Sequence, residues 1–160
     1  MKMFIVIAAM TLSTLAQATP LVGDYSHFNI TLKTEGESIS GFLKMTLTDK
    51  TADTYNMTTI FHIEGLGTST DEETVATSDL MNDETITHYL TNCVAEEGKL
   101  ETITVPAGKF KTCALNLNSD RVWIARVPFG FVKKIEPSAE NTNKLTAIYE
   151  LQSFVNGKTK

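Results

Sequence analysis

The chain has 160 residues, of which 42% are hydrophobic and 21% are charged. Its 19 acidic residues outnumber its 14 basic residues, and the formal net charge is −5 at pH 7. An acidic balance without a run of basic residues argues against a protein that binds nucleic acid or anionic lipid headgroups by charge. The length suits one domain with a hydrophobic core of ordinary size.

The first 18 residues have the pattern of a secretory signal peptide. Lys2 gives a positive start, the segment Phe4–Leu15 is mostly apolar and uncharged, and Ala16 and Ala18 supply the small residues of an A-x-A cleavage site. This apolar run has about a dozen residues, whereas a membrane-spanning helix needs roughly 20. We therefore expect residues 1–18 to be cleaved from a bacterial protein that is periplasmic or secreted, without stable membrane insertion afterwards.

Three segments then alternate between apolar and polar side chains, which is typical of half-buried strands. They are Asp24–Lys33, Ser38–Thr48 and Thr54–Glu64, and the residues between them favour turns. The next segment, Thr68–Thr77, is polar and acidic, and we interpret it as a loop or an edge strand. Together these segments predict a meander of antiparallel strands.

The hydrophobic period becomes helical within Ser78–Ala95. Four apolar positions fall at i, i+3, i+4 and i+7, which places them on one face of a helix. They are Ile86, Tyr89, Leu90 and Cys93. We expect the helix to end near Cys93 and to pack this face on the sheet.

Five further strands are predicted after the helix, from their β-branched and aromatic residues. A Pro-Ala-Gly-Lys turn separates the first two, because proline suits a turn corner and glycine adopts positive φ. The five strands are Leu100–Val105, Phe110–Leu117, Arg121–Arg126, Phe131–Glu136 and Leu145–Phe154. We expect one β-rich domain over residues 19–155 and a flexible tail at 156–160.

The two cysteines, Cys93 and Cys113, are 20 positions apart. Two cysteines in an exported chain usually form one disulfide. A zinc site would need further ligands at close spacing, and a redox dithiol would need a C-x-x-C motif. The sequence has neither pattern, so we expect a structural disulfide that ties the helix to a strand, and no metal or other cofactor.

The predicted fold is therefore α+β and mainly antiparallel β. We expect a curved sheet or half-open barrel of about eight strands that cups one helix and carries one disulfide.

The second half of the chain also carries a family resemblance. Residues 103–113 read ITVPAGKFKTC, residues 123–125 read WIA, residues 129–133 read FGFVK, and residues 149–154 read YELQSF. This series resembles a family of uncharacterised bacterial exported domains. In that family a VPAGxF hairpin precedes a tryptophan strand, a W-x-A-x-x-x-G-x-V-K run and a closing YEL-x-S-F strand.

The resemblance covers roughly residues 93–154, and the first three strands fit it by pattern alone. The chain departs from it at Arg126–Gly130, where the family often has APGVG. Domains of this family are similar in outline to the half-open barrels of lipoprotein carriers, in which a curved antiparallel sheet cups a helix. The resemblance implies a fold and an envelope setting, and it implies no reaction.

The sequence shows no catalytic constellation, and we expect no enzyme. His27 and His62 lie on the more polar faces of their strands, and His88 lies at the border of the helix's apolar face. The two strand histidines could approach one another in a hydrolase if their strands were neighbours. No motif orients them towards a nucleophile, so we interpret them as surface or partly exposed residues.

The aromatic residues offer the best candidates for contact with a ligand or partner. Trp123, Phe129 and Phe131, with other aromatic side chains, could line the concave side of the sheet and leave a cavity for a fatty acyl chain or another apolar ligand. The commoner role of such residues is to fill a core. Pro128 and Phe129 form a turn that, if exposed, could anchor a protein partner.

These features lead to three hypotheses about function. The first is a non-enzymatic exported binding protein of the bacterial cell envelope, with an apolar, lipid-like ligand. The second is an accessory protein that acts through its surface on another envelope protein, and a hydrolase comes third. The oligomeric state and the identity of the ligand are not determined by the sequence.

Overall fold

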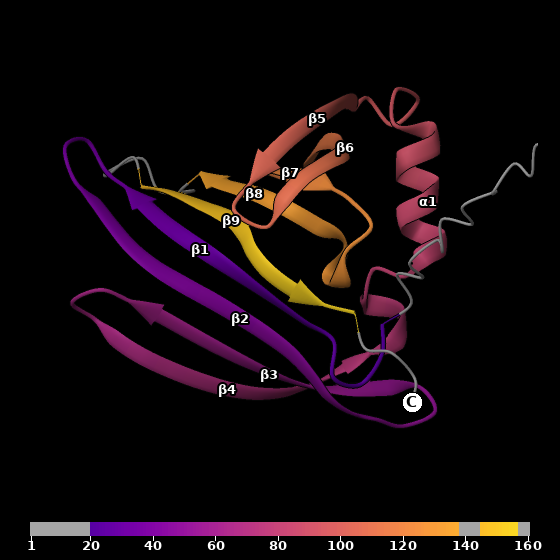
Figure 1. The fold of residues 1–160 in the computed structure, drawn as a ribbon, viewed down its shortest axis with the longest axis horizontal. Helices are drawn as coiled ribbons and strands as arrows, with labels where there is room; N and C mark the ends of the chain where they lie inside the picture. Colours follow the sequence, from indigo (N-terminus) through magenta and orange to yellow (C-terminus); the bar gives the residue numbers. More distant parts are fainter. Residues whose placement is uncertain (1–19, 138–144, 157–160) are drawn as a thin grey trace, which may run out of the picture.

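The computed structural model describes residues 20–137 and 145–156. The expected signal peptide lies outside these ranges, as do residues 157–160 of the expected tail. The described part of the chain forms an antiparallel sheet of nine strands with one α-helix and two short 3-10 helices (Figure 1). The predicted α+β class, with its single helix and a sheet that does not close, is confirmed.

The strands follow the predicted segments closely. The polar segment after the third strand is an edge strand, β4, which brings the count from the expected eight to nine. The strands are β1 (Tyr25–Lys33), β2 (Ser38–Lys50), β3 (Thr54–Ile63), β4 (Gly67–Ala76), β5 (Lys99–Val105), β6 (Gly108–Leu117), β7 (Asp120–Ile124), β8 (Phe131–Pro137) and β9 (Thr146–Val155).

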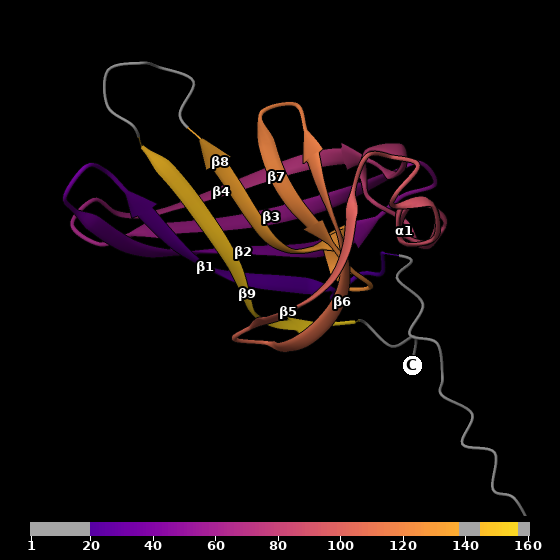
Figure 2. The ribbon, with the colours of Figure 1, turned by 90° about the horizontal axis from the view of Figure 1, so that it is seen from above.

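The strand order across the sheet is β4-β3-β2-β1-β9-β8-β7-β6-β5. Two meanders, β1–β4 and β5–β9, are therefore joined by the pairing of the first strand with the last. Seen from above, the sheet is strongly twisted, and β6 and β7 run steeply across the direction of β2 and β3 (Figure 2). This twist makes a deep, curved surface from a single sheet.

The helix α1 (Asp83–Asn92) follows a 3-10 turn, η1 (Thr77–Asp79). The Asn82 side chain caps it, because its Oδ1 accepts a 2.8 Å hydrogen bond from the Thr85 N–H. Two acidic residues in the first turn suit the positive end of the helix dipole. The helix stands at one end of the molecule beside β5 and β6 (Figures 1 and 2).

The register assigns side chains to the two faces, because paired residues of antiparallel strands point to the same side. Val122 pairs with Lys134, Lys134 with Tyr149, and Tyr149 with Ile30. Residues of β2 and β3 on this same face line one cavity with residues of β7 and β8, although β1 and β9 lie between them. We call this the concave face and the opposite one the convex face.

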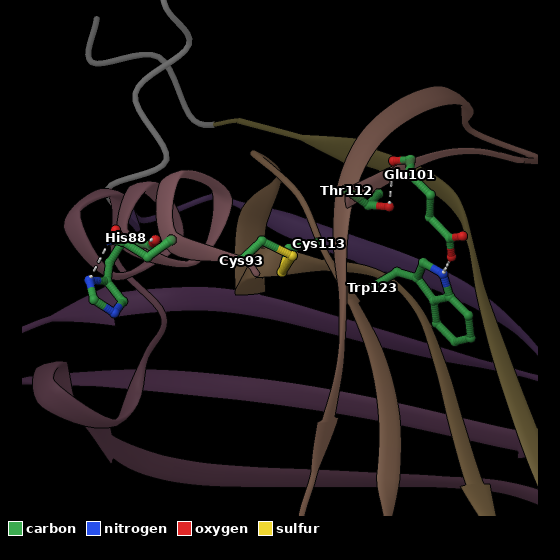
Figure 3. The surroundings of a disulfide bond; sticks show 7 residues. His88, Cys93, Glu101, Thr112, Cys113 and Trp123 are labelled. Carbon is green, nitrogen blue, oxygen red and sulfur yellow. Dashed lines mark hydrogen bonds between the residues drawn. A yellow bond between two sulfur atoms is a disulfide. The ribbon is translucent and has the colours of Figure 1, made fainter. Parts of the chain in front are cut away.

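The helix is fixed to the concave face by the predicted disulfide. Cys93, directly after α1, is bonded to Cys113 of β6, with Cα atoms 5.7 Å apart (Figure 3). Both are fully buried in one cluster with Ile86 of the helix and Ile124 of β7. Gly98 passes so close that a Cβ there would lie 2.8 Å from both sulfur atoms, so the crossing requires a glycine.

Candidate ligand-binding cavity

The concave face holds a cavity of about 340 Å³ that opens to solvent. This volume lies within the range of roughly 300–1,000 Å³ that is typical of small-molecule sites. Its apolar lining comes from β2, β3, the segment before α1, the end of β6, β7, η2 (Pro128–Gly130) and β8. The apolar residues are Met45, Met57, Leu80, Met81, Leu117, Val122, Phe129 and Phe131.

Three methionines give this cavity an adaptable wall. Met45 and Met57 lie on neighbouring strands, and Met81 lies just before the helix. A thioether side chain has three rotatable bonds and a polarisable sulfur, so it adjusts to ligands of different shape. Leu80 is buried against Tyr55 and fixes the segment that carries Met81.

The turn before β8 shapes another wall of the cavity and bears on the hypothesis of a partner anchor. The Pro128–Phe129 turn is largely covered, since Pro128 is buried, Phe129 is half-buried, and the Pro128 carbonyl accepts a 3.0 Å hydrogen bond from the buried Ser26 Oγ. Phe129 has φ of 63°, a strained conformation for a bulky residue, and it is half-buried in the cavity lining. A Cβ on Gly130 would collide with Met81, so this glycine permits the close approach of the two segments.

Phe131 joins the cavity to the core beneath it. Its ring stacks on the fully buried Phe28 of β1, with ring centroids 4.6 Å apart and planes 12° from parallel. Both phenylalanines that the sequence indicated as contact candidates, Phe129 and Phe131, therefore line the same cavity.

A polar network lies at one side of the cavity. Lys134 Nζ contacts Asp120 Oδ2 at 3.0 Å and also forms an ion pair with Glu136, while the Tyr149 hydroxyl donates to Glu136 Oε2 at 2.9 Å. Burial by itself lowers the pKa of Lys134, but its contacts with the two carboxylates outweigh this and raise the pKa. Burial, together with the bond to Glu136, raises the pKa of Tyr149. Lys134 is therefore a charged lysine whose charge is already compensated.

Trp123, the third aromatic candidate, lies away from the cavity on the convex face. Its register partner Lys133 forms a 2.7 Å ion pair with Glu150, and the Lys133 and Arg121 cations lie 5.6 and 5.0 Å from the centroid of the indole ring. The indole N–H donates to Glu101 at 2.6 Å (Figure 3). Trp123 is only 7% exposed because it also belongs to a buried apolar cluster with Val105 and Ala114, so we interpret it as a structural residue that these polar contacts orient.

The hydrogen bond from Trp123 also favours the ionised form of its acceptor, the Glu101 carboxyl group. The hydrogen bond from Trp123, supported by Lys99, lowers the pKa of the Glu101 carboxyl group. The ionised carboxylate is the better acceptor, so the bond favours that form.

The histidines are separated from one another and from the cavity. His27 and His62 lie on the convex face of β1 and β3, with Phe42 of β2 between them at ring-centroid distances of 5.3 and 5.2 Å. Burial, together with the charge of Lys44, lowers the pKa of His27. His62 Nδ1 contacts the exposed Thr68 hydroxyl at 2.8 Å. β2 lies between β1 and β3, so the two strands are not neighbours and the histidine pair considered for a hydrolase does not form.

A second hollow, of about 530 Å³, lies between α1 and the β5–β6 hairpin. Its apolar residues include Leu90, Leu100 and Phe110, and its charged residues are all basic. Lys109 and Lys111 are exposed there. This second hollow differs from the concave cavity because its described lining includes no acidic residue and no residue of β1–β4.

Within residues 20–137 and 145–156, no group of three or more His, Cys, Asp and Glu side chains is placed to hold a metal ion. The same residues contain no helix long and apolar enough to cross a bilayer. No protein-family model matches the chain, and comparison with curated proteins finds no match.

The sequence patterns did not indicate some of the residues that line the cavity. The helical pattern predicted within Ser78–Ala95 included Leu80 and Met81, but α1 begins only at Asp83, after the Asn82 cap, so these two residues lie in the cavity wall and not on the helix. Asp120 and Lys134 gave no local signal, because their contact depends on the pairing of β7 with β8.

Proposed function

We propose that this protein is an exported, non-enzymatic binding protein of the bacterial cell envelope, and that its concave cavity holds an apolar or amphiphilic small molecule. The observation that carries the proposal is an apolar cavity of about 340 Å³ with a single compensated polar network at its side. Such a combination of apolar walls and a few placed polar groups is typical of ligand sites.

Two further features support this setting. The disulfide fits an oxidising compartment, such as the periplasm or the extracellular space. The half-open outline agrees with the family resemblance of residues 93–154, and the N-terminal pattern of residues 1–18 supports export. Hydrolysis is less well supported, because His27 and His62 lie on the face opposite the cavity.

The turn at Phe129 gives little support to the second hypothesis, an accessory protein that acts through its surface. The neighbouring Pro128 is buried, and Phe129 is a half-buried residue of the cavity lining. This arrangement favours a small ligand over a protein anchored at that turn.

A fluorescence titration with the neutral apolar dye N-phenyl-1-naphthylamine tests the proposal. The protein should bind the dye and raise its fluorescence, and Leu117→Trp should abolish most of this increase, because the larger ring fills the cavity. Leu66→Trp is the matched control, since Leu66 is 81% exposed in the turn between β3 and β4. Absence of dye binding by the folded protein, or equal binding by both variants, would contradict a ligand site in the concave cavity.

A further inference from the structure

We infer that the concave cavity selects amphiphiles with a cationic head over amphiphiles with an anionic head. This inference rests on the proposed binding function and specifies the chemical class of the ligand. It depends on the charges at the cavity and on how those charges are already paired.

The only basic residue in the described cavity lining is not free to bind an anion. Lys134 would by itself suggest a site for the carboxylate of a fatty acid. Its ammonium group, however, already contacts both Asp120 and Glu136. An anionic head would have to displace one of these carboxylates or share the ammonium group with them, and either arrangement places like charges close together.

The carboxylates outnumber the ammonium group. Asp79 and Asp120 line the cavity, and Glu136, which is outside the lining, is ion-paired with Lys134. Counted together, the cavity lining and its ion-paired neighbour Glu136 carry three carboxylates and one ammonium group, a charge of 1 − 3 = −2. A cationic head would therefore gain attraction, and an anionic head would meet repulsion.

The aromatic wall favours the same choice. Phe129 and Phe131 line the cavity together with these charges. The face of an aromatic ring attracts a cation, and quaternary ammonium groups are commonly recognised in this way. Carboxylates and phenyl rings in one cavity thus suit an alkylammonium head above an apolar chain.

Displacement of the neutral dye by three amphiphiles with the same twelve-carbon chain tests the inference, each used below its micelle concentration. They are dodecyltrimethylammonium, laurate and the uncharged dodecyl maltoside. Dodecyltrimethylammonium should displace the dye at a concentration about fivefold below that of laurate in low salt, and added salt should reduce the difference. Equal or stronger displacement by laurate would overturn the inference while leaving the binding function in place. Failure of the dye and of all three amphiphiles to bind would overturn both.

Asp120→Asn provides the second arm, because it removes one negative charge while keeping the shape of the side chain. It also leaves Lys134 with one carboxylate partner, so the preference for the cationic head should decrease clearly. Glu72→Gln is the matched control, since this exposed carboxylate lies on the opposite face, in β4. An unchanged head-group preference in Asp120→Asn would also overturn the inference.

Discussion

The two meanders of the sheet are held in different ways. In β4, the outer strand of the first meander, eight of ten residues are exposed, and the strand is held mainly by its ladder with β3. In β6, four consecutive residues, Thr112–Leu115, are buried, and the adjoining helix is linked by a disulfide. The second meander is thus fixed by covalent and tertiary contacts, whereas the edge of the first depends on backbone pairing.

The cavity lies where these two parts meet. Met45 and Met57 come from the first meander, and Val122 and Phe131 come from the second. The shape of the cavity therefore depends on the better-fixed part and on the less-fixed part together. Local opening of the first meander would change the site without unfolding the second.

The largest expected effect comes from removal of the disulfide. The double variant Cys93→Ala/Cys113→Ala should lose about 3 kcal/mol of unfolding free energy, because the bond closes a loop of 20 positions. Chemical denaturation measures this loss. In the variant, the rate of amide hydrogen exchange should increase much more in α1 and β5 than in β2 and β3. Uniform acceleration across all strands would contradict the contrast between the two parts.

A smaller effect is expected from the ion pair that ties the helix start to the segment after β7. Arg126 donates to Asp83 at 2.5 Å and to the Thr87 hydroxyl at 2.8 Å. Since both charged side chains are more than a third exposed, Arg126→Ala should cost only about 1 kcal/mol. Thermal unfolding measures this cost.

Arg126→Lys is the control for that experiment. It keeps the charge but loses the fork that reaches two acceptors, so it should recover only part of the stability. Full recovery would show that charge alone holds the helix start.

The smallest effect is expected in the pH dependence of stability. The folded state lowers the pKa of Glu101 through the Trp123 bond, so this bond contributes fully above the ordinary glutamate pKa of about 4.3. The contribution is lost as the pH falls through the lowered pKa of the folded state. Trp123→Phe should therefore make the decline of unfolding free energy in acid shallower than in the parent protein. An unchanged slope in denaturation curves at several acidic pH values would count against this coupling.

The fold could be predicted because its signals are local. Alternation along Ser38–Thr48 identified β2, the Pro-Ala-Gly turn identified the β5–β6 hairpin, and the apolar period around Ile86 identified α1. Cys93 lay on the apolar face of that period, which also indicated what the disulfide would join.

The cavity could be predicted only in part because its geometry is non-local. The sequence indicated Phe129 and Phe131, but it grouped them with Trp123, which the register places on the other face. It also left the exposure of the Pro128 turn open, because a contact such as the hydrogen bond from Ser26, 102 positions away, gives no local signal. The first outcome depends on the register of β7 with β8, and the second depends on a contact between β1 and the turn before β8.

The acidic edge strand β4 has a consequence for encounters between copies of the protein. An unpaired strand edge is a template on which a second chain can add its own strand and begin aggregation. In β4 the centre of this edge carries Asp71, Glu72 and Glu73, all exposed. Two such strands meeting antiparallel about their centres would bring these carboxylates face to face, which is unfavourable. The residues that leave β4 weakly packed therefore also oppose the addition of a further strand at this edge of the sheet.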